Sequence, residues 1–393
     1  MKTAGIICEY DPFHKGHEYM ISELRRAGAE NVICLMSGNA VQRGEPAILP
    51  REYRAEAAVC GGADAVFELP YPWCSASAGD FARVGVTILA SLGCDTVAFG
   101  SETGDLSLIE DCAARMTVTA GEGNITDTIC RNSVGTAGEF LRRTGADILG
   151  PNDLLGANYV CAARIAGLEK LVFFPVKRVG AGHDSEEDGE YPSASRLRGL
   201  ILRGQIPEGM TEKMREELIR AVSAGRCPVT FDNVSPAILS FWRTADPAEA
   251  GKFAECGGGV AGLLRHAAEE VGNFADMTAA AATKKYTNAR LRRAILFGMT
   301  GITHADLRGA PAYVRLLCAN ERGRTYLASI RRTKTIAVVT KPCRIPAGEA
   351  ALRQREMGRR LDALLTLACP VPMALTEEAR LGAVMTDTSG DDK

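Results

Sequence analysis

Short apolar runs alternate with amphipathic stretches through the first half of the chain. Each run is continuously apolar, as is typical of a strand buried on both faces, and the stretches between the runs have helical spacing. This alternation predicts an α/β fold with a parallel sheet and crossover helices. The predicted strands are 3–8, 31–36, 64–69, 95–100 and 171–176, and the predicted helices are 17–28, 51–60, 77–92 and 105–116.

The pattern changes after Ser193. Helical spacing then dominates, and a β-branched run returns only at 335–342. We therefore expect an α/β domain over 1–205 and a mainly helical domain over 206–385. The last residues, 386–393, are small, polar and acidic, which predicts a flexible tail. The stretches with helical spacing are 211–222, 236–243, 262–271 and 289–299.

Composition agrees with a globular protein of two domains. The chain has 393 residues, of which 46% are hydrophobic and 24% charged, and this length exceeds what one core usually supports. Its 13 cysteines include no C-x-x-C pair, so we expect them to be reduced, mostly buried, and not to form a metal site. No signal peptide or membrane span is apparent, so we expect a cytoplasmic protein without a membrane partner.

Positive charge is concentrated in one segment. Residues 284–360 contain 18 Lys and Arg against four acids, a net charge of +14, whereas the whole chain carries −2. Such a run is often only a solvated face, but Tyr286, Tyr313 and Tyr326 lie within it, as in surfaces that bind RNA phosphates and stack bases. The RNA-binding candidates are Lys284, Lys285, Arg290, Arg292 and Arg293.

His14, Gly16 and His17 stand where the first predicted strand meets the first predicted helix. A helix N-terminus offers unpaired N–H groups and a positive dipole end, so the junction favours a phosphate group. The glycine would let a triphosphate approach, and both imidazoles could donate hydrogen bonds to it. The alternative is structural: His14 caps a turn and His17 is a partly buried helix residue.

A second motif follows the last predicted strand, at PSASRLR, residues 192–198. Ser193 and Ser195 open a helix and Arg198 lies in its first turns, an arrangement suited to the β- and γ-phosphates of a nucleotide. A serine at a helix start is more often only an N-cap.

Together the two motifs resemble the H-x-G-H and I-S-S-T-x-x-R signatures of the nucleotidylyltransferase superfamily. Further blocks resemble one family within it, the tRNA(Met) cytidine acetate ligases, along nearly the whole chain. The sequence departs from the family's usual N-P-F-H-N-G-H at Asp11 and Lys15, and has Ser195 where threonine is usual. The blocks are MSGNAVQRGEPAILP (36–50), GADAVFELP (62–70), FGSE (99–102), PNDLLG (151–156), KRVGAGHDS (177–185), KKYTNARLRRAIL (284–296) and PAYVRLL (311–317).

The resemblance implies a HIGH-motif, Rossmann-like catalytic domain followed by a tRNA-binding domain. It implies that ATP, with Mg²⁺, and acetate form acetyl-adenylate, and that the acetyl group passes to the exocyclic amine of the wobble cytidine of elongator tRNA(Met). His14, His17 and Arg178 are then the catalytic candidates. The candidate ATP contacts are Ile7, Cys8, Glu9, Tyr10, Asp11, Pro12, Phe13, His14, Lys15, Gly16, His17, Glu18, Tyr19, Met20, Gly100, Asn152 and Arg178, with Ser193, Ser195 and Arg198 from the second motif.

Some candidates and alternatives stay open. Glu9 and Glu68 could position metal-bound water or act as caps, and His183 and Asp184 could assist acyl transfer or be ordinary loop residues. Two further histidines are expected to be structural. The competing functions are a nucleotide adenylyltransferase for a small phosphorylated metabolite and a non-catalytic RNA-binding protein. The loop residues Gln42, Arg43 and Glu45 are candidates for contacting the acceptor nucleotide, and the structural histidines are His266 and His304.

Overall fold

The computed structural model describes residues 1–121, 141–178 and 192–386. Within these ranges eight strands form one sheet in the order β5-β4-β1-β2-β3-β6-β7, and β8 also pairs with β6. Strands β1 to β5 are mutually parallel, as predicted, and β6 runs antiparallel to β3. The strands are β1 (Thr3–Cys8), β2 (Asn31–Ser37), β3 (Ala65–Leu69), β4 (Thr96–Ser101), β5 (Val172–Lys177), β6 (Tyr313–Ala319), β7 (Ala337–Val339) and β8 (Val384–Met385).

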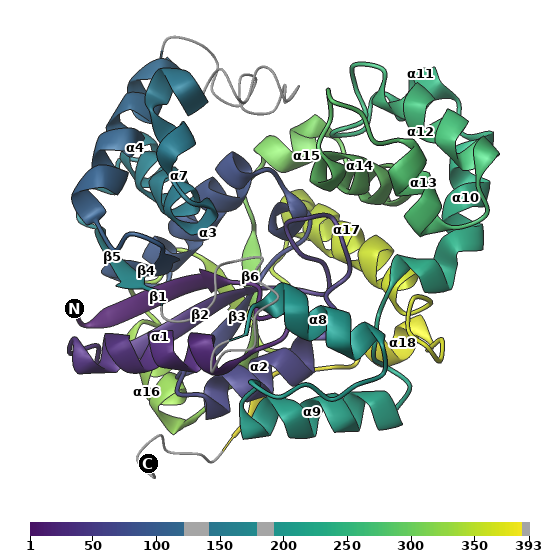
Figure 1. Ribbon diagram of the computed structural model, residues 1–393. Helices are drawn as coiled ribbons and strands as arrows, with labels where there is room; N and C mark the ends of the chain where they lie inside the picture. Colours follow the sequence, from purple (N-terminus) through teal and green to yellow (C-terminus); the bar gives the residue numbers. More distant parts are fainter. Residues whose placement is uncertain (122–140, 179–191, 387–393) are drawn as a thin grey trace.

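Helices cover both faces of the sheet, and a group of them lies to one side of it (Figure 1). The α-helices are α1 (Lys15–Arg26), α2 (Arg51–Cys60), α3 (Ala78–Ser91), α4 (Leu106–Gly121), α7 (Pro151–Ile165), α8 (Ala194–Leu202), α9 (Glu212–Ser223), α10 (Ser235–Thr244), α11 (Pro247–Ala250), α12 (Val260–Glu270), α13 (Phe274–Ala280), α14 (Asn288–Thr300), α15 (His304–Arg308), α16 (Glu321–Ser329), α17 (Glu349–Leu365) and α18 (Leu375–Glu378). The short 3-10 helices are η1 (Trp73–Ser75), η2 (Ala146–Ile148) and η3 (Phe231–Val234).

Alternate residues of the central strands enter two separate cores. Ile6 of β1 packs in the cluster that contains side chains of α1, α2, α8 and α9, whereas Ile7 packs in the cluster that contains side chains of α3 and α7. Both side chains are buried, which explains why the strand is a continuous apolar run rather than an alternating one. The α/β fold class predicted from these runs is therefore confirmed.

The second half of the chain is not purely helical. After the helices α10 to α15, which we call the helical lobe (residues 235–308), the chain returns to the sheet as β6 and then adds β7 and β8. Helix α9 packs against α2. The sheet thus extends across the boundary predicted at residue 205, and the helical lobe is the part that lies beside it (Figure 1). Of the predicted tail, only Thr386 lies within the described residues.

Candidate active site

A cavity of about 450 Å³ lies at the carboxyl ends of β1, β4 and β5. Strand β1 has β2 on one side and β4 on the other, so the chain leaves β1 toward one half of the sheet and later fills the other half. Ligands of open α/β sheets bind at such a switch point. The first residues of α1, α7 and α8 also line the cavity, and these helix ends favour an anionic ligand.

His14 and His17 form a stacked pair at the start of α1, with ring centroids 3.7 Å apart. His14 is the N-cap: its Nδ1 accepts a hydrogen bond from the Gly16 N–H at 3.1 Å. Nδ1 of His17 accepts from the His14 N–H at 3.3 Å. Because Nδ1 is an acceptor in each ring, the neutral ring carries its proton on Nε2. Both rings line the cavity, so two Nε2–H donors are available there.

Both imidazoles are held in the neutral form. Burial, followed by the guanidinium groups of Arg178 and Arg198, lowers the pKa of His14 from 6.5 to about 3. Burial, His14 and Arg178 lower the pKa of His17 well below its ordinary value. The pair therefore offers hydrogen bonds without positive charge at neutral pH, and the cationic charge near it comes from the arginines.

Gly16 leaves room for the ring of His14, the N-cap of α1. A Cβ at this position would lie 3.0 Å from Cε1 and 3.1 Å from Nδ1 of His14, tighter than nearly all real contacts. A larger residue would therefore displace the ring that accepts its own N–H. This close contact gives a reason for the glycine beyond access for a triphosphate.

Helix α8 brings Arg198 to the cavity, and Asp11 holds it there. Arg198 donates to the Asp11 backbone carbonyl at 2.8 Å and to the Ser195 hydroxyl at 3.0 Å, and lies 3.7 Å from the Asp11 carboxylate. The other Asp11 oxygen accepts from the Ile48 N–H at 2.7 Å. The Asp11 side chain is only 2% exposed, so this acid anchors an arginine and a loop. Ser193 is the N-cap of α8.

Two of the quoted sequence blocks meet at the N-terminus of α7. Glu102, just after β4, accepts hydrogen bonds from the backbone N–H groups of Asn152 and Asp153 at 3.1 and 2.9 Å, and from the Asn152 side chain. Although burial opposes the charged form, these hydrogen bonds lower the pKa of Glu102. The free N–H groups of this helix are thus already partly satisfied by a protein carboxylate, and Asn152 is oriented by it.

Arg54 on α2 fixes the loop over the cavity, residues 38–50. Its fully buried guanidinium donates to the carbonyls of Leu49 at 2.9 Å, Glu9 at 2.5 Å and Ser37 at 3.2 Å, and to that of Gly38. The Glu9 carboxylate accepts from the Gln42 N–H at 2.9 Å. The ends of β1 and β2 are therefore tied to the loop. Sequence reasoning missed Arg54 because its acceptors are backbone carbonyls.

The cavity brings together most, but not all, of the predicted nucleotide contacts. The residues that do not line it are Pro12, Phe13, Lys15, Glu18 and Ser193. The predicted residues that line it are Ile7, Cys8, Glu9, Tyr10, Asp11, His14, Gly16, His17, Tyr19, Met20, Gly100, Asn152, Arg178, Ser195 and Arg198, and Gln42 and Arg43 of the loop join them. Lining residues that were not predicted include Phe81, Leu154, Asn158 and Tyr159.

The predicted RNA-binding arginines lie in different surroundings. Arg290 and Arg293 on α14 are each 7% exposed and pair with the buried Glu255 at 3.3 and 3.0 Å. Their guanidinium groups pair inside the helical lobe, so little of either is open to RNA phosphates, and their predicted contact with RNA stays a prediction. Arg292 pairs with Glu45 of the loop at 3.0 Å. Lys284 and Lys285 are exposed, as an RNA contact requires.

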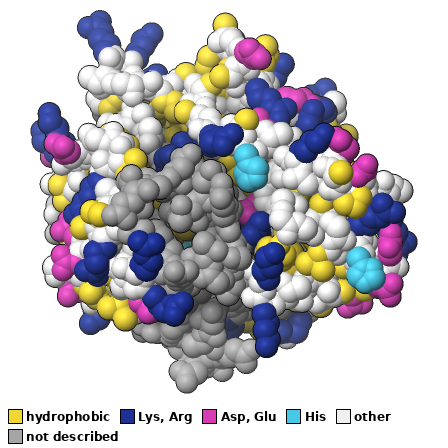
Figure 2. Space-filling model, turned by 90° about the horizontal axis from the view of Figure 1, so that it is seen from above, with side chains coloured by type: hydrophobic (Ala, Val, Ile, Leu, Met, Phe, Trp, Pro, Cys, Tyr) yellow, Lys and Arg dark blue, Asp and Glu magenta, His cyan; other side chains and the backbone are white. Residues whose placement is uncertain are grey.

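The three tyrosines of the basic segment are buried. The Tyr286 and Tyr326 hydroxyls donate to the carbonyls of Gly258 and Leu92, so these rings are not open stacking platforms. Tyr313 instead lines a second cavity. Figure 2, which views the molecule from above, shows Lys and Arg side chains spread over both the helical lobe and the side of α4 and α7. Part of the positive charge of residues 284–360 is thus neutralised by the ion pairs of Arg290, Arg292 and Arg293 within the protein.

The remaining candidates lie away from the cavity or outside the described chain. Glu68 is buried and paired with Arg51 at 3.2 Å. His266 and His304 are exposed and line none of the cavity, and His183 and Asp184 lie outside the described residues. The described cysteines are all free, and Cys60 and Cys343 among them are exposed rather than buried. Among the described residues no cluster of His, Cys, Asp or Glu could hold a metal, and no helix is long and apolar enough to span a membrane.

The fold and the histidine pair define a nucleotidyltransferase of the HIGH class. A family model described as HIGH Nucleotidyl Transferase matches residues 1–366, so the chain belongs to that family. Relatives narrow the assignment. The tRNA(Met) cytidine acetate ligase of Lactobacillus delbrueckii subsp. bulgaricus is 33% identical over 358 residues, which cover 90% of this chain and 93% of that protein. The ligase of Acetivibrio thermocellus is 31% identical over 368 residues, covering 87% and 88%.

Two solved structures support the same family assignment. Thermotoga maritima TmcAL without ligand is 25% identical and superimposes with a TM-score of 0.87, covering 99% of this chain and 100% of that one. The same protein bound with alpha-thio ATP gives a TM-score of 0.85 over the same shares. The chain belongs to the tRNA(Met) cytidine acetate ligase family.

Proposed function

We propose that the protein activates acetate with ATP and transfers the acetyl group to the exocyclic amine of the wobble cytidine in elongator tRNA(Met), in the cytoplasm. The observation that carries the proposal is the His14–His17 pair. Both rings line a cavity at the switch point of the sheet, at the positive end of α1, and the bonds to each Nδ1 leave Nε2–H as the donor of each neutral ring. The geometry alone does not identify the substrates, and we infer their identity from the family to which the chain belongs.

The first step forms acetyl-adenylate. An acetate oxygen attacks the α-phosphorus of ATP, the bond to the bridging oxygen breaks, and pyrophosphate leaves with the electron pair. Negative charge gathers on the phosphate oxygens, where preorganised N–H donors are worth a few kcal/mol each. We assign this role to His14, His17, Arg178 and Arg198, with Asp11 positioning Arg198. No protein side chain needs to form a covalent bond.

The second step transfers the acetyl group. The cytidine amine attacks the acetyl carbonyl carbon, AMP leaves with the electron pair of the broken C–O bond, and the nitrogen loses a proton as the amide forms. The amine must therefore reach the same cavity as the adenylate. The loop side chains Gln42 and Arg43 line that cavity and are assigned to contact the acceptor nucleotide.

We propose that Mg²⁺ enters as part of the ATP substrate. The carboxylates that line the cavity are engaged with the protein: Glu9 accepts from the Gln42 N–H, and Asp11 from the Ile48 N–H. Mg²⁺ usually keeps several waters and binds substrate phosphates with one or two carboxylates, so no protein cage is required.

The test is to incubate the purified protein with ATP, Mg²⁺ and labelled acetate, with and without tRNA. The proposal expects AMP and pyrophosphate, and label on a cytidine of tRNA(Met) when RNA is present. If labelled acetyl-coenzyme A transfers its label and acetate with ATP does not, the proposed acyl donor is wrong. If AMP forms on a phosphorylated metabolite instead, the protein is an adenylyltransferase of another kind.

A further inference from the structure

A second cavity, of about 610 Å³, is lined by Arg51, the residue that directly follows loop 38–50. Its walls come from the end of β3, the start of β6, and helices α17 and α18, and among the described residues none lines both this cavity and the candidate active site. Asn39 at one end of the loop contacts Asp362 and Glu378 near this second cavity, while Gln42 and Arg43 line the first. The two cavities are therefore separate sites that border one loop.

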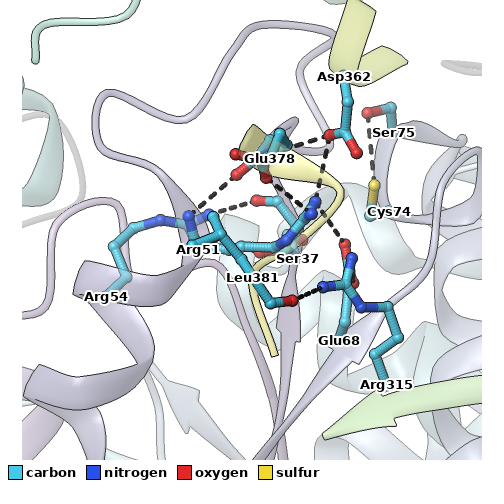
Figure 3. Close-up of polar contacts among 12 residues, drawn as sticks. Ser37, Arg51, Arg54, Glu68, Cys74, Ser75, Arg315, Asp362, Glu378 and Leu381 are labelled. Carbon is cyan, nitrogen blue, oxygen red and sulfur yellow. Dashed lines mark hydrogen bonds and ion pairs between the residues drawn. The ribbon is translucent and has the colours of Figure 1, made fainter. Parts of the chain in front are cut away.

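The floor of the second cavity is a network of ion pairs. Arg51 contacts the carboxylates of Glu68, Asp362 and Glu378 at 3.2, 3.3 and 2.8 Å, and Arg315 lies 3.5 Å from Glu68 (Figure 3). Each arginine is thus already engaged by protein carboxylates. The floor has no spare cation for an anionic ligand, and it contains more carboxylates than arginines.

One acceptor of this network is left over. Oδ1 of Asp362 accepts from both Asn39 and Arg51, whereas Oδ2 has no hydrogen-bond partner within the described residues. Figure 3 shows this second oxygen free of dashed lines. The side chain keeps 15% of its surface accessible and lines the cavity. The floor therefore presents an oxygen that can accept an N–H group from a ligand.

The wall and the mouth have different chemistry. Tyr313 is 6% exposed, lines the cavity, and its hydroxyl makes no hydrogen bond to any described residue. Arg355 and Arg359 lie at i and i+4 on α17, both exposed and both lining the cavity. Arg359 pairs with Glu356 at 2.8 Å, but Arg355 has no hydrogen bond or ion pair within the described chain. The mouth thus offers a cation, and the wall offers an aromatic ring with a hydroxyl.

A ligand that matches this order has an N–H donor inside, a flat ring in the middle and an anion outside. A nucleotide has these parts, and proteins recognise RNA sequence mainly by enclosing unstacked bases against aromatic or arginine planes. We propose that the second cavity binds one unstacked nucleotide of the tRNA substrate, with its phosphate at Arg355 and an amino-bearing base at Asp362. This inference rests on the proposed function, because that function makes tRNA the partner.

The base preference follows from the acceptor. Adenine, guanine and cytosine each carry an exocyclic amine that can donate to Oδ2 of Asp362, whereas the one N–H donor of the uracil base, at N3, lies between two carbonyl oxygens that the carboxylate would repel. We expect AMP, GMP or CMP to bind more tightly than UMP when the active site is saturated with a non-hydrolysable ATP analogue. Asp362→Asn, whose amide can donate, should shift the preference toward UMP. Equal affinities for all four mononucleotides, with no shift in Asp362→Asn, would overturn the base site.

The mouth is tested by Arg355→Glu. This change should weaken mononucleotide binding at least about tenfold, the loss expected for a charge-assisted hydrogen bond, and should raise the KM for tRNA. Arg324→Glu on α16 is the matched control, because this substitution changes the net charge by the same amount. Arg324 is exposed and lines neither cavity. Normal thermal melting of each variant shows that its effect does not come from a loss of folding. Mononucleotide binding by Tyr313→Phe, which keeps the ring and removes only the hydroxyl, provides a second variant for the same comparison. Unaltered mononucleotide affinity in Arg355→Glu contradicts the proposal.

Two results separate this proposal from the proposed function. If Arg355→Glu loses mononucleotide binding but keeps the tRNA KM of Arg324→Glu, the occupant is a free nucleotide and the assignment to tRNA is wrong. If the unmodified protein forms no AMP from ATP and acetate without RNA, the proposed function fails, whatever the second cavity binds.

Discussion

Arginines have different roles in the α/β part and in the helical lobe. In the α/β part, Arg178 and Arg198 border the candidate active site; together with burial, both lower the pKa of His14, and Arg178 also lowers that of His17. In the helical lobe, Arg290 and Arg293 are buried against Glu255. Arg178 and Arg198 were predicted from motifs that lie at the ends of strands of the sheet. Arg290 and Arg293 were predicted from a count of charges. A motif at a strand end fixes where a side chain lies, whereas a charge count does not reveal which charges are already paired.

The largest effect is expected in the helical lobe. Arg293→Met removes one of two cations from a buried glutamate, and breaking a buried pair in this way should lower the free energy of unfolding by about 3 to 5 kcal/mol. The matched control is Arg292→Met on the same helix, whose pair with Glu45 is partly exposed and should be worth about 1 kcal/mol or less. Urea unfolding measures both. Equal losses would mean that the buried pairs do not hold the lobe together.

The next effect concerns the histidine pair. His17→Ala removes an Nε2–H donor from the cavity and the acceptor for the His14 N–H. The rate of acetate-dependent AMP formation should fall by about 100-fold, the loss typical of one preorganised donor. Arg26→Ala on the same helix is the control, because Arg26 is exposed and does not line the cavity. A folded His17→Ala protein with an unchanged rate would remove this histidine from the mechanism.

Stability should also depend on pH through the same pair. The unfolded chain binds a proton at His14 below pH 6.5, but the folded protein does so only near pH 3, so stability falls as the pH drops through this window. At pH 5 the pKa difference corresponds to about 2 kcal/mol for His14. The free energy of unfolding should therefore decrease less between pH 7.5 and pH 5 in His14→Gln than in the unmodified protein. Parallel pH curves would show that His14 is not held neutral.

Much of the α/β part could be predicted because its signals are local. Continuous apolar runs marked β1 to β5, and the histidine motif directly followed the first of them. Strand β6 was not predicted: its run includes Arg315, and its antiparallel partner β3 is distant in the chain. The tautomers of the two histidines also escaped prediction, since they depend on which N–H groups reach each Nδ1.

The buried ion pairs could not be predicted for a related reason. Arg51 stands at the start of α2, while two of its partners, Asp362 and Glu378, lie near the end of the described chain. Nothing in the spacing of charges reveals pairs that join so distant positions. The same limitation explains why the basic segment appeared to offer more free cations than it does.

The smallest effect is expected at the exposed lysines that remain RNA-binding candidates. Each phosphate contact that is lost should reduce the slope of log K for tRNA against log salt by roughly one. Lys284→Ala should show this full reduction. Lys285→Ala should show less, because the Lys285 ammonium already lies over the Tyr286 ring, 5.1 Å from its centroid. Lys170→Ala, exposed on the turn before β5, is the control with the same change in charge. Neither change should alter thermal melting, since both side chains are exposed. If all three variants keep the parent's salt slope, tRNA does not contact this part of the basic segment, and its exposed charges only solvate the surface.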